Sequence, residues 1–245
     1  MHRIAMMESL PADRLHRVLE EVSQVAETAG RAGQVQLVAV SKTVLPDQIF
    51  EVYQAGQRVF GENRVQERTA KIGTLSTCMP DAKWHLIGHL QTNKARVAAE
   101  SFDLIESIDS LKIASTLDRW ACNAGSVVDV LVQVNVAAEH SKHGVATERF
   151  WDDLQVMESL RGLCLRGLMT IAPLTANVED VRPVFRRLRE LRDAVRDRRH
   201  LAGFTELSMG MSRDFPVAIQ EGATIVRVGR AIFGERPPNE MPRRQ

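Results

Sequence analysis

A lysine at the end of a predicted buried strand is the first residue in this sequence that suggests chemistry. Residues 36–41 are mostly apolar, and they run directly into Lys42. A protein core seldom takes up an ammonium group unless the group has a partner or a task. The alternative interpretation is a surface lysine that follows a strand, which would be favoured for an isolated Val-Ser-Lys. The other polar residues of the chain decide between the two.

The elements that must position Lys42 alternate regularly along the chain. Runs with strand character are predicted at 36–41, 58–61, 84–88, 104–108, 129–136, 165–171, 206–209 and 224–228. Amphipathic helices are predicted between them at 46–55, 65–72, 92–100, 111–123, 147–160, 181–200 and 216–221, with none after the last strand. Strands that alternate with helices form βαβ units and a parallel sheet.

Eight such units in 245 residues match the size of a single (β/α)8 barrel, the TIM barrel. A doubly wound sheet is the alternative, but no Gly-x-Gly-x-x-Gly follows the first strand. Residues 9–30 predict an extra helix ahead of the barrel, because apolar residues recur there at spacings of three and four. The expected domains are therefore an N-terminal helix that packs on the barrel (1–34), the barrel (35–234) and a flexible tail (235–245).

Polar residues recur at the predicted C-terminal ends of the strands, where barrels of this kind carry their chemistry. Two of these groups resemble a phosphate site, because small Gly-bearing turns around Ser212 and Gly229 follow the last two strands. Tight turns and a helix cap are an equally good explanation of those residues when they are taken alone. A lysine and an anion cradle in one barrel mouth together suit pyridoxal 5′-phosphate, whose aldehyde condenses with an amine.

The motifs at these strand ends resemble those of the YggS/PROSC family, the pyridoxal phosphate homeostasis proteins. The resemblance covers residues 35–234 in order. The motifs that carry it are Leu37-Val-Ala-Val-Ser-Lys42-Thr, Phe60-Gly-Glu-Asn63-Arg-Val-Gln-Glu, Trp84-His85-Leu-Ile-Gly-His-Leu-Gln91-Thr-Asn93-Lys94, Ser141-Lys142-His-Gly144, Arg166-Gly-Leu-Met169-Thr-Ile, Leu207-Ser-Met-Gly-Met-Ser212 and Val226-Arg227-Val-Gly229. The resemblance implies the barrel of the alanine racemase N-terminal domain, fold type III among pyridoxal phosphate proteins.

The resemblance also implies a set of contacts to pyridoxal phosphate. Lys42 would form the Schiff base, and Arg227 would face the pyridine nitrogen. Lys142 matches a family lysine beside the pocket and is a candidate relay, whereas Val44 replaces a second lysine that several members carry. The residues predicted to bind the cofactor are Lys42, Asn63, His85, Met169, Ser208, Ser212, Arg227, Gly229 and Arg230. For several residues a purely structural role is the alternative to a cofactor contact. His85 would then be a hydrogen-bonded histidine inside the barrel, Met169 a core residue, and Asn63 and Asn135 braces of their loops.

An arginine at the pyridine nitrogen favours binding over turnover. Enzymes that stabilise full carbanions on this cofactor usually place a carboxylate on the ring nitrogen, which keeps the nitrogen protonated. Arg227 stays charged and cannot accept that proton, so it would leave the nitrogen unprotonated. Tyrosine is the second base that racemases with this arrangement use, but the sole tyrosine, Tyr53, is expected mid-helix and far from the mouth. The predicted function is a homeostasis protein that holds the cofactor and delivers it, with apo enzymes as possible recipients. The alternative is a single-domain amino-acid racemase or lyase, with Lys142 or His85 as its second base.

Composition argues against other classes of protein. A net charge of +1 and 5% aromatic residues disfavour nucleic-acid binding, and no apolar run reaches the roughly 18 residues of a membrane span. The helix at 181–200 carries eight arginines but also interleaved acids and a clean apolar stripe, which favours the solvated face of a barrel helix. Three widely spaced cysteines predict a reducing cytoplasm. Both a monomer and a dimer remain compatible with the sequence.

Overall fold

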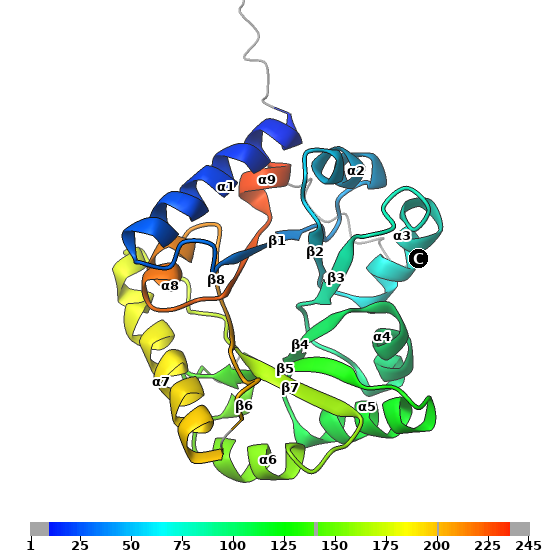
Figure 1. Cartoon of the computed structure of the whole chain (residues 1–245), viewed down its shortest axis with the longest axis vertical. Coiled ribbons are helices and arrows are strands. Elements are labelled where there is room, and N and C mark those ends of the chain that lie inside the picture. The colour runs from blue at the N-terminus through cyan, green and yellow to red at the C-terminus, as the bar shows by residue number, and fades with distance from the viewer. Residues whose placement is uncertain (1–9, 140–141, 200, 236–245) are drawn as a thin grey trace, which may run out of the picture.

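Eight parallel strands close into a ring in the computed structural model, which describes residues 10–139, 142–199 and 201–235 (Figure 1). Their order around the ring is β1 (Gln36–Val40), β2 (Val59–Glu62), β3 (Lys83–Leu86), β4 (Leu104–Ile108), β5 (Val128–Asn135), β7 (Leu163–Met169), β8 (Glu206–Met211) and β9 (Ile225–Val228). The ring is closed because β1 pairs with both β2 and β9, and β4 pairs with β5. The predicted (β/α)8 barrel is confirmed.

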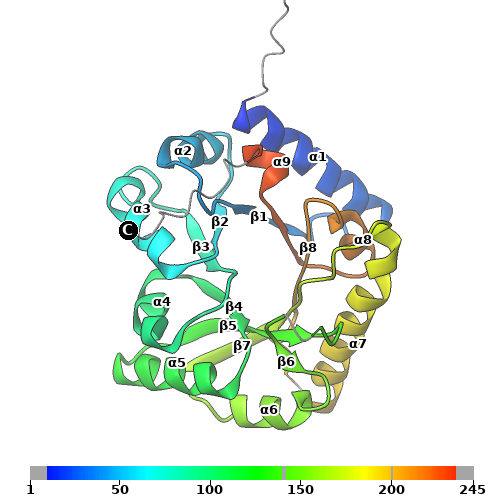
Figure 2. The same ribbon diagram turned by 180° about the vertical axis from the view of Figure 1, so that it is seen from behind.

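The helices surround the ring on its outside, as the view from behind also shows (Figure 2). They are α1 (Pro11–Thr28), α2 (Pro46–Gln54), α3 (Val65–Leu75), α4 (Ala95–Ser101), α5 (Leu111–Asn123), α6 (Phe150–Met157), α7 (Arg182–Arg199), α8 (Phe215–Gln220) and α9 (Arg230–Phe233), with 3-10 turns η1 (Thr92–Lys94) and η2 (Val178–Val181). None of the described helices is both long enough and apolar enough to cross a membrane.

Two short elements were missed by the sequence analysis. The two-residue strand β6 (Val145–Ala146) pairs with β5 outside the ring, and α9 follows the last strand, where no helix was predicted. Both are too short to show a hydrophobic period, so a pattern-based analysis has no signal for them. α9 matters for the site because Arg230, its first residue, lies at the mouth of the barrel.

Two separate apolar layers hold the barrel together. The larger one lies between the sheet and the helices and includes Phe60, Phe185 and Phe215. The smaller one fills the inside of the ring and consists of Val38, Val59, Leu104, Leu131, Met169 and Ile225. Side chains in a strand alternate between the two faces of the sheet, so one strand can contribute to both layers. β3 and β8 add no apolar residue to the inner layer.

The N-terminal helix α1 is tied to the last βα units. Arg14 Nε donates to the carbonyl of Ile232 in α9 at 2.6 Å, and Arg31 Nη1 donates to the carbonyls of Ile219 and Ala223 at 3.0 and 2.7 Å. The buried face of α1, which includes Leu15, packs on the main core. Residues 236–245 of the predicted tail lie outside the described residues.

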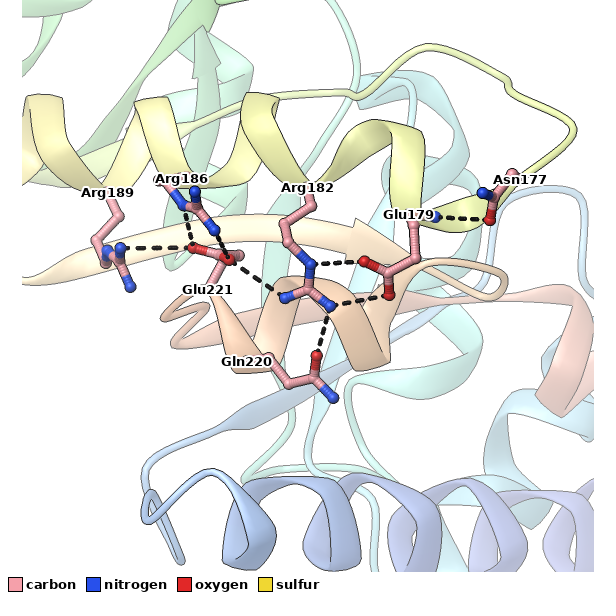
Figure 3. Close-up of polar contacts among 7 residues, drawn as sticks. All are labelled: Asn177, Glu179, Arg182, Arg186, Arg189, Gln220 and Glu221. Atoms are coloured by element: carbon pink, nitrogen blue, oxygen red, sulfur yellow. Dashed lines mark hydrogen bonds and ion pairs between the residues drawn. The ribbon is translucent and has the colours of Figure 1, made fainter.

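The arginine-rich helix α7 packs along α8 through a cluster of ion pairs (Figure 3). Three of its arginines, Arg182, Arg186 and Arg189, converge on the carboxylate of Glu221 with N–O distances of 3.2, 3.1 and 3.4 Å. Arg182 also binds Glu179 at 2.6 Å. These three arginines of α7 therefore bind the residue that follows α8 and link the two helices.

Candidate functional site

A cavity of about 640 Å³ opens at the C-terminal ends of the strands. Six of the predicted site residues line it together: Lys42, Asn63, Ser212, Arg227, Gly229 and Arg230. They come from strand ends that are far apart in the sequence, and closure of the barrel brings them together. Lys42 and the loops that follow β8 and β9 therefore face one common space.

Lys42 lies in a tight turn at the end of β1. The carbonyl of Ser41 accepts a hydrogen bond from Val44 N at 3.0 Å, so residues 41–44 form the turn. Thr43 has a φ of +60°, a left-handed conformation that is unfavourable for a β-branched residue. Strained residues of this kind persist only where the surroundings fix them, and they cluster at functional sites. The turn thus fixes the backbone of the half-buried Lys42 at the cavity.

A buried ion pair lies directly behind this turn. Lys71 Nζ donates to the carbonyl of Ser41 at 2.8 Å and to Glu62 Oε1 at 2.6 Å, and Ser41 Oγ donates to the same carboxylate oxygen at 2.7 Å. Burial, together with a hydrogen bond to Glu67, raises the pKa of Glu62 to about 7, although Lys71 and Ser41 act in the opposite direction. The residue before Lys42 is therefore anchored to a carboxyl group that titrates near neutrality.

A second polar network crosses the inside of the barrel below the cavity. Arg227 donates to the hydroxyl of Ser208 and, through Nη2, to the carbonyl of Thr170 at 2.8 Å. Ser208 Oγ donates to Glu106 Oε2 at 2.5 Å, and His85 Nδ1 lies 2.7 Å from Glu106 Oε1. This network holds the Arg227 side chain, which is only 4% exposed, at the floor of the cavity.

The charges in this network depend on one another. Burial acts to raise the pKa of Glu106, but the contacts with His85, Arg227 and Ser208 outweigh it, and the pKa lies below its usual value. Burial lowers the pKa of Arg227, while the charge of Glu106 opposes that shift. Because a guanidinium group still remains protonated at any working pH, Arg227 is a fixed cation and a donor, never a proton acceptor.

Three of the predicted cofactor contacts lie deeper than expected and do not line the cavity. His85 is the third residue of a four-residue strand and borders a hollow at the opposite, N-terminal ends of the strands. Ser208 is fully buried between Glu106 and Arg227, and Met169 is fully buried in the apolar layer inside the ring. These residues were expected at the mouth because the predicted strand ends are imprecise. An error of two residues in a strand end moves a side chain on the same face by a whole layer.

The predicted relay lysine is also outside the cavity. Lys142 Nζ binds Glu139 Oε1 at 2.7 Å, on the segment between β5 and β6. Asn135 braces that segment, donating from Nδ2 to the carbonyl of Glu139 at 2.9 Å and accepting from Glu139 N at 3.2 Å. Asn135 thus has the contacts expected of a loop brace, whereas Asn63 lines the cavity.

Several cavity residues were not predicted. They are Val40, Ile87, Gly88, His89, Ile171, Leu174, Met211, Arg213 and Asp214. Arg213 had the clearest signal, because it directly follows Ser212 in a turn already singled out. Asp214 Oδ1 accepts from Met211 N at 2.6 Å and so closes this turn. The turn presents a hydroxyl and a guanidinium on the same side of the cavity as Gly229 and Arg230, a donor set suited to an anion.

Two glycines at the mouth are required by close packing. A Cβ at Gly88 would lie 2.3 Å from the carbonyl oxygen of Asn63, so only glycine lets these loops pass. Gly210 has a φ of +92°, and a Cβ there would lie 2.6 Å from Cβ of Ala218 in α8. Gly210 therefore serves the packing of α8 against β8, and approach to a ligand is not needed to explain it.

Comparison with known proteins agrees with this architecture. The family described as alanine racemase, N-terminal domain, matches residues 14–237 of the chain. The match covers most of α1 and the whole barrel, and it defines the class of barrel to which the cavity belongs.

Proteins that are more similar to the chain identify its family within this class. The pyridoxal phosphate homeostasis protein of Aquifex aeolicus is 46% identical over 225 residues, which cover 91% of this chain and 97% of the relative. That of Haemophilus influenzae is 40% identical over 223 residues, covering 89% and 94%. The solved structure of PipY from Synechococcus elongatus with PLP bound is 40% identical, with a TM-score of 0.82 over 91% of this chain and 100% of that chain. This chain therefore belongs to the family of pyridoxal phosphate homeostasis proteins, as its motifs predicted.

Proposed function

We propose that this chain binds pyridoxal 5′-phosphate in the cavity at the mouth of the barrel and acts in its homeostasis. The observation that carries the proposal is that Lys42 shares one cavity with the anion-binding set of Ser212, Arg213, Gly229 and Arg230. A volume of about 640 Å³ is within the usual range for small-molecule sites. The names of the relatives and the bound PLP in PipY support the same ligand.

The residues present fit such a ligand. When bound, pyridoxal phosphate supplies an aldehyde that condenses with a primary amine and a ring that withdraws electrons. Lys42 is the amine of the cavity, and the turn at 41–44 fixes its backbone. Arg213 and Arg230 offset the charge of a phosphate group, and the hydroxyl of Ser212 donates to it. The apolar side chains of Ile87 and Ile171 exclude water from the rest of the cavity.

Arg227 favours binding over turnover. A fixed cation at the cavity floor cannot accept a proton and does not keep a facing ring nitrogen protonated. The two second bases considered for a racemase, Lys142 and His85, bind Glu139 and Glu106 and lie outside the cavity. Tyr53 binds Asp81 beside Arg58, on the outer side of the barrel. We therefore propose a protein that holds the cofactor and hands it over without substantial catalysis.

The rest of the proposal rests on the sequence. Apo enzymes that use the same cofactor are the proposed recipients. The three cysteines are all unpaired, which supports a reducing cytoplasm as the location. A monomer and a dimer both remain compatible with the proposal.

Borohydride reduction of the cofactor-loaded chain tests the assignment of Lys42. We expect peptide mapping to find the reduced cofactor on the peptide that contains Lys42. Lys42→Ala should lose this adduct, whereas Lys142→Ala, a matched loop lysine outside the cavity, should keep it. If Lys42→Ala retains an adduct of equal stoichiometry, the site is misassigned. Rapid exchange of the α-proton of L-alanine in deuterated water, with racemisation, would instead show that the chain is an amino-acid racemase.

A further inference from the structure

The rim of the barrel mouth carries a cluster that the proposed function does not use. His89 follows β3, Asp109 follows β4, and His143 lies between β5 and β6, so three neighbouring strand ends each contribute one side chain. His89 Nδ1 lies 2.7 Å from Asp109 Oδ2, and His143 Nδ1 lies 3.6 Å from the same oxygen. One ligand atom from each residue lies within 4.8 Å of the others. We propose that His89, Asp109 and His143 bind a divalent transition-metal ion such as Zn²⁺ or Co²⁺.

The chemistry of the three donors selects this class of ion. Two imidazole nitrogens and one carboxylate oxygen suit Zn²⁺, Co²⁺, Ni²⁺ or Cu²⁺, whereas Ca²⁺ and Mg²⁺ prefer oxygen ligands throughout. The two imidazole rings already lie face to face, with centroids 4.1 Å apart and an interplanar angle of 14°. Binding of one ion by both nitrogens would require the rings to rotate about their side-chain bonds, out of this stack and toward Asp109.

The exposure of the three residues allows both a fixed anchor and access from solvent. The Asp109 side chain is only 8% exposed, and Ser110 Oγ donates to its other oxygen at 3.2 Å. The His89 and His143 side chains are 43% and 60% exposed. The carboxylate is therefore held in place, while the imidazoles have room to turn and an ion has an open path to them.

The backbones that carry the two histidines are also held in place. Ser107 Oγ donates to the carbonyl of Gly88 at 2.7 Å, immediately before His89. Gln133 Nε2 donates to the carbonyl of His143 itself at 2.9 Å. These two bonds hold the backbone beside each imidazole, so only the side-chain torsions have to change when an ion binds. A bound ion would link three loops and place a positive charge at the rim of the Lys42 cavity, which His89 also lines.

Titration of the full-length chain with Co²⁺ under reducing conditions tests the site, because tetrahedral Co²⁺ bound by protein ligands absorbs visible light. We expect one Co²⁺ per chain, displaced by Zn²⁺. His143→Gln and His89→Gln should each weaken binding at least about tenfold. His16→Gln is the matched control, since this exposed histidine of α1 is remote from the cluster, and it should bind like the wild type.

Two results would overturn the metal site. One is unchanged Co²⁺ affinity in His143→Gln, which would leave the cluster as a hydrogen-bonded group only. The other is the absence of a Co²⁺ spectrum at any concentration that keeps the chain folded. Unfolding midpoints of the variants, measured without metal, show that a loss of affinity is not a loss of fold. The adduct on Lys42 is measured separately, so either proposal can fail without the other.

Discussion

Two carboxylates of this barrel meet cations in opposite settings. Glu221 lies between α7 and α8, where three arginines reach it, and its pKa is lowered because hydrogen bonds from Arg186 and Arg182 outweigh the effect of burial (Figure 3). Glu62 is fully buried behind Lys42. Lys71 is the one cation in ion-pair contact with it among the described residues, and burial, together with a hydrogen bond to Glu67, raises its pKa to about 7. A close ion pair therefore does not by itself keep a carboxyl group ionised; the number of charged donors must match the cost of burial.

Removal of the ammonium group that pairs with Glu62 should give the largest effect. At pH 8, Lys71→Met should lower the free energy of unfolding by about 3–5 kcal/mol, because it leaves a buried carboxylate without its partner. Denaturant unfolding measures it. At pH 5.5 the loss should be smaller, since Glu62 is then protonated in the folded chain. Lys83→Met is the control, because its pair with Asp103 is exposed and should contribute less than about 1 kcal/mol. Equal losses in both variants would refute this account of the buried pair.

The raised pKa of Glu62 predicts a dependence of stability on pH. The folded chain holds this proton more tightly than the unfolded chain, whose carboxyl has the ordinary value of 4.5. Stability therefore falls as the pH rises from about 4.5 through 7, by up to about 3 kcal/mol from this group. Glu62→Gln should remove that slope, as unfolding curves at several pH values would reveal. Parallel profiles for the two proteins would mean that Glu62 stays ionised throughout.

The Glu221 cluster should respond less strongly. Glu221→Gln should cost about 1–2 kcal/mol at pH 7, because the three arginines are partly exposed and regain water. The lowered pKa contributes stability above the ordinary value of 4.5, and this is lost as the pH falls through the folded pKa, so wild type and variant should converge in acid. Thermal unfolding at pH 7 and pH 3 tests this. Glu190→Gln, which breaks an exposed pair with Arg187 at 3.7 Å, should be nearly silent. A Glu221→Gln that is equally silent would show that the cluster adds nothing.

Much of the barrel was predictable because its strands are short apolar runs followed by polar residues. That pattern located Lys42 and the loops after β8 and β9, and the closed ring brings them to one cavity. Depth within the ring was not predictable. His85 and Ser208 lie one layer below the mouth, since the register of each strand against its neighbours is a tertiary property.

A charged residue inside an apolar strand could have predicted the polar network inside the barrel. Glu106 occurs in the middle of the apolar run Leu104–Ile108, and it accepts hydrogen bonds from Ser208 and contacts His85 and Arg227. A carboxylate in such a run is rare unless it has partners, so its presence predicts an internal cationic group. Two of these partners, His85 and Ser208, lie 21 and 102 positions away in the sequence, and no local pattern links residues so far apart.

The contacts of α1 have a consequence for how the chain is assembled. This helix precedes every strand of the barrel, yet Arg14 of the helix and Arg31, which follows it, bind carbonyls of residues 219–232. The first strand likewise has one neighbour, β9, near the far end of the sequence. The ring therefore cannot close before β9 has been synthesised, and its apolar interior stays open until then. We therefore expect chaperones to protect the unfinished barrel in the cell until β1 can pair with β9.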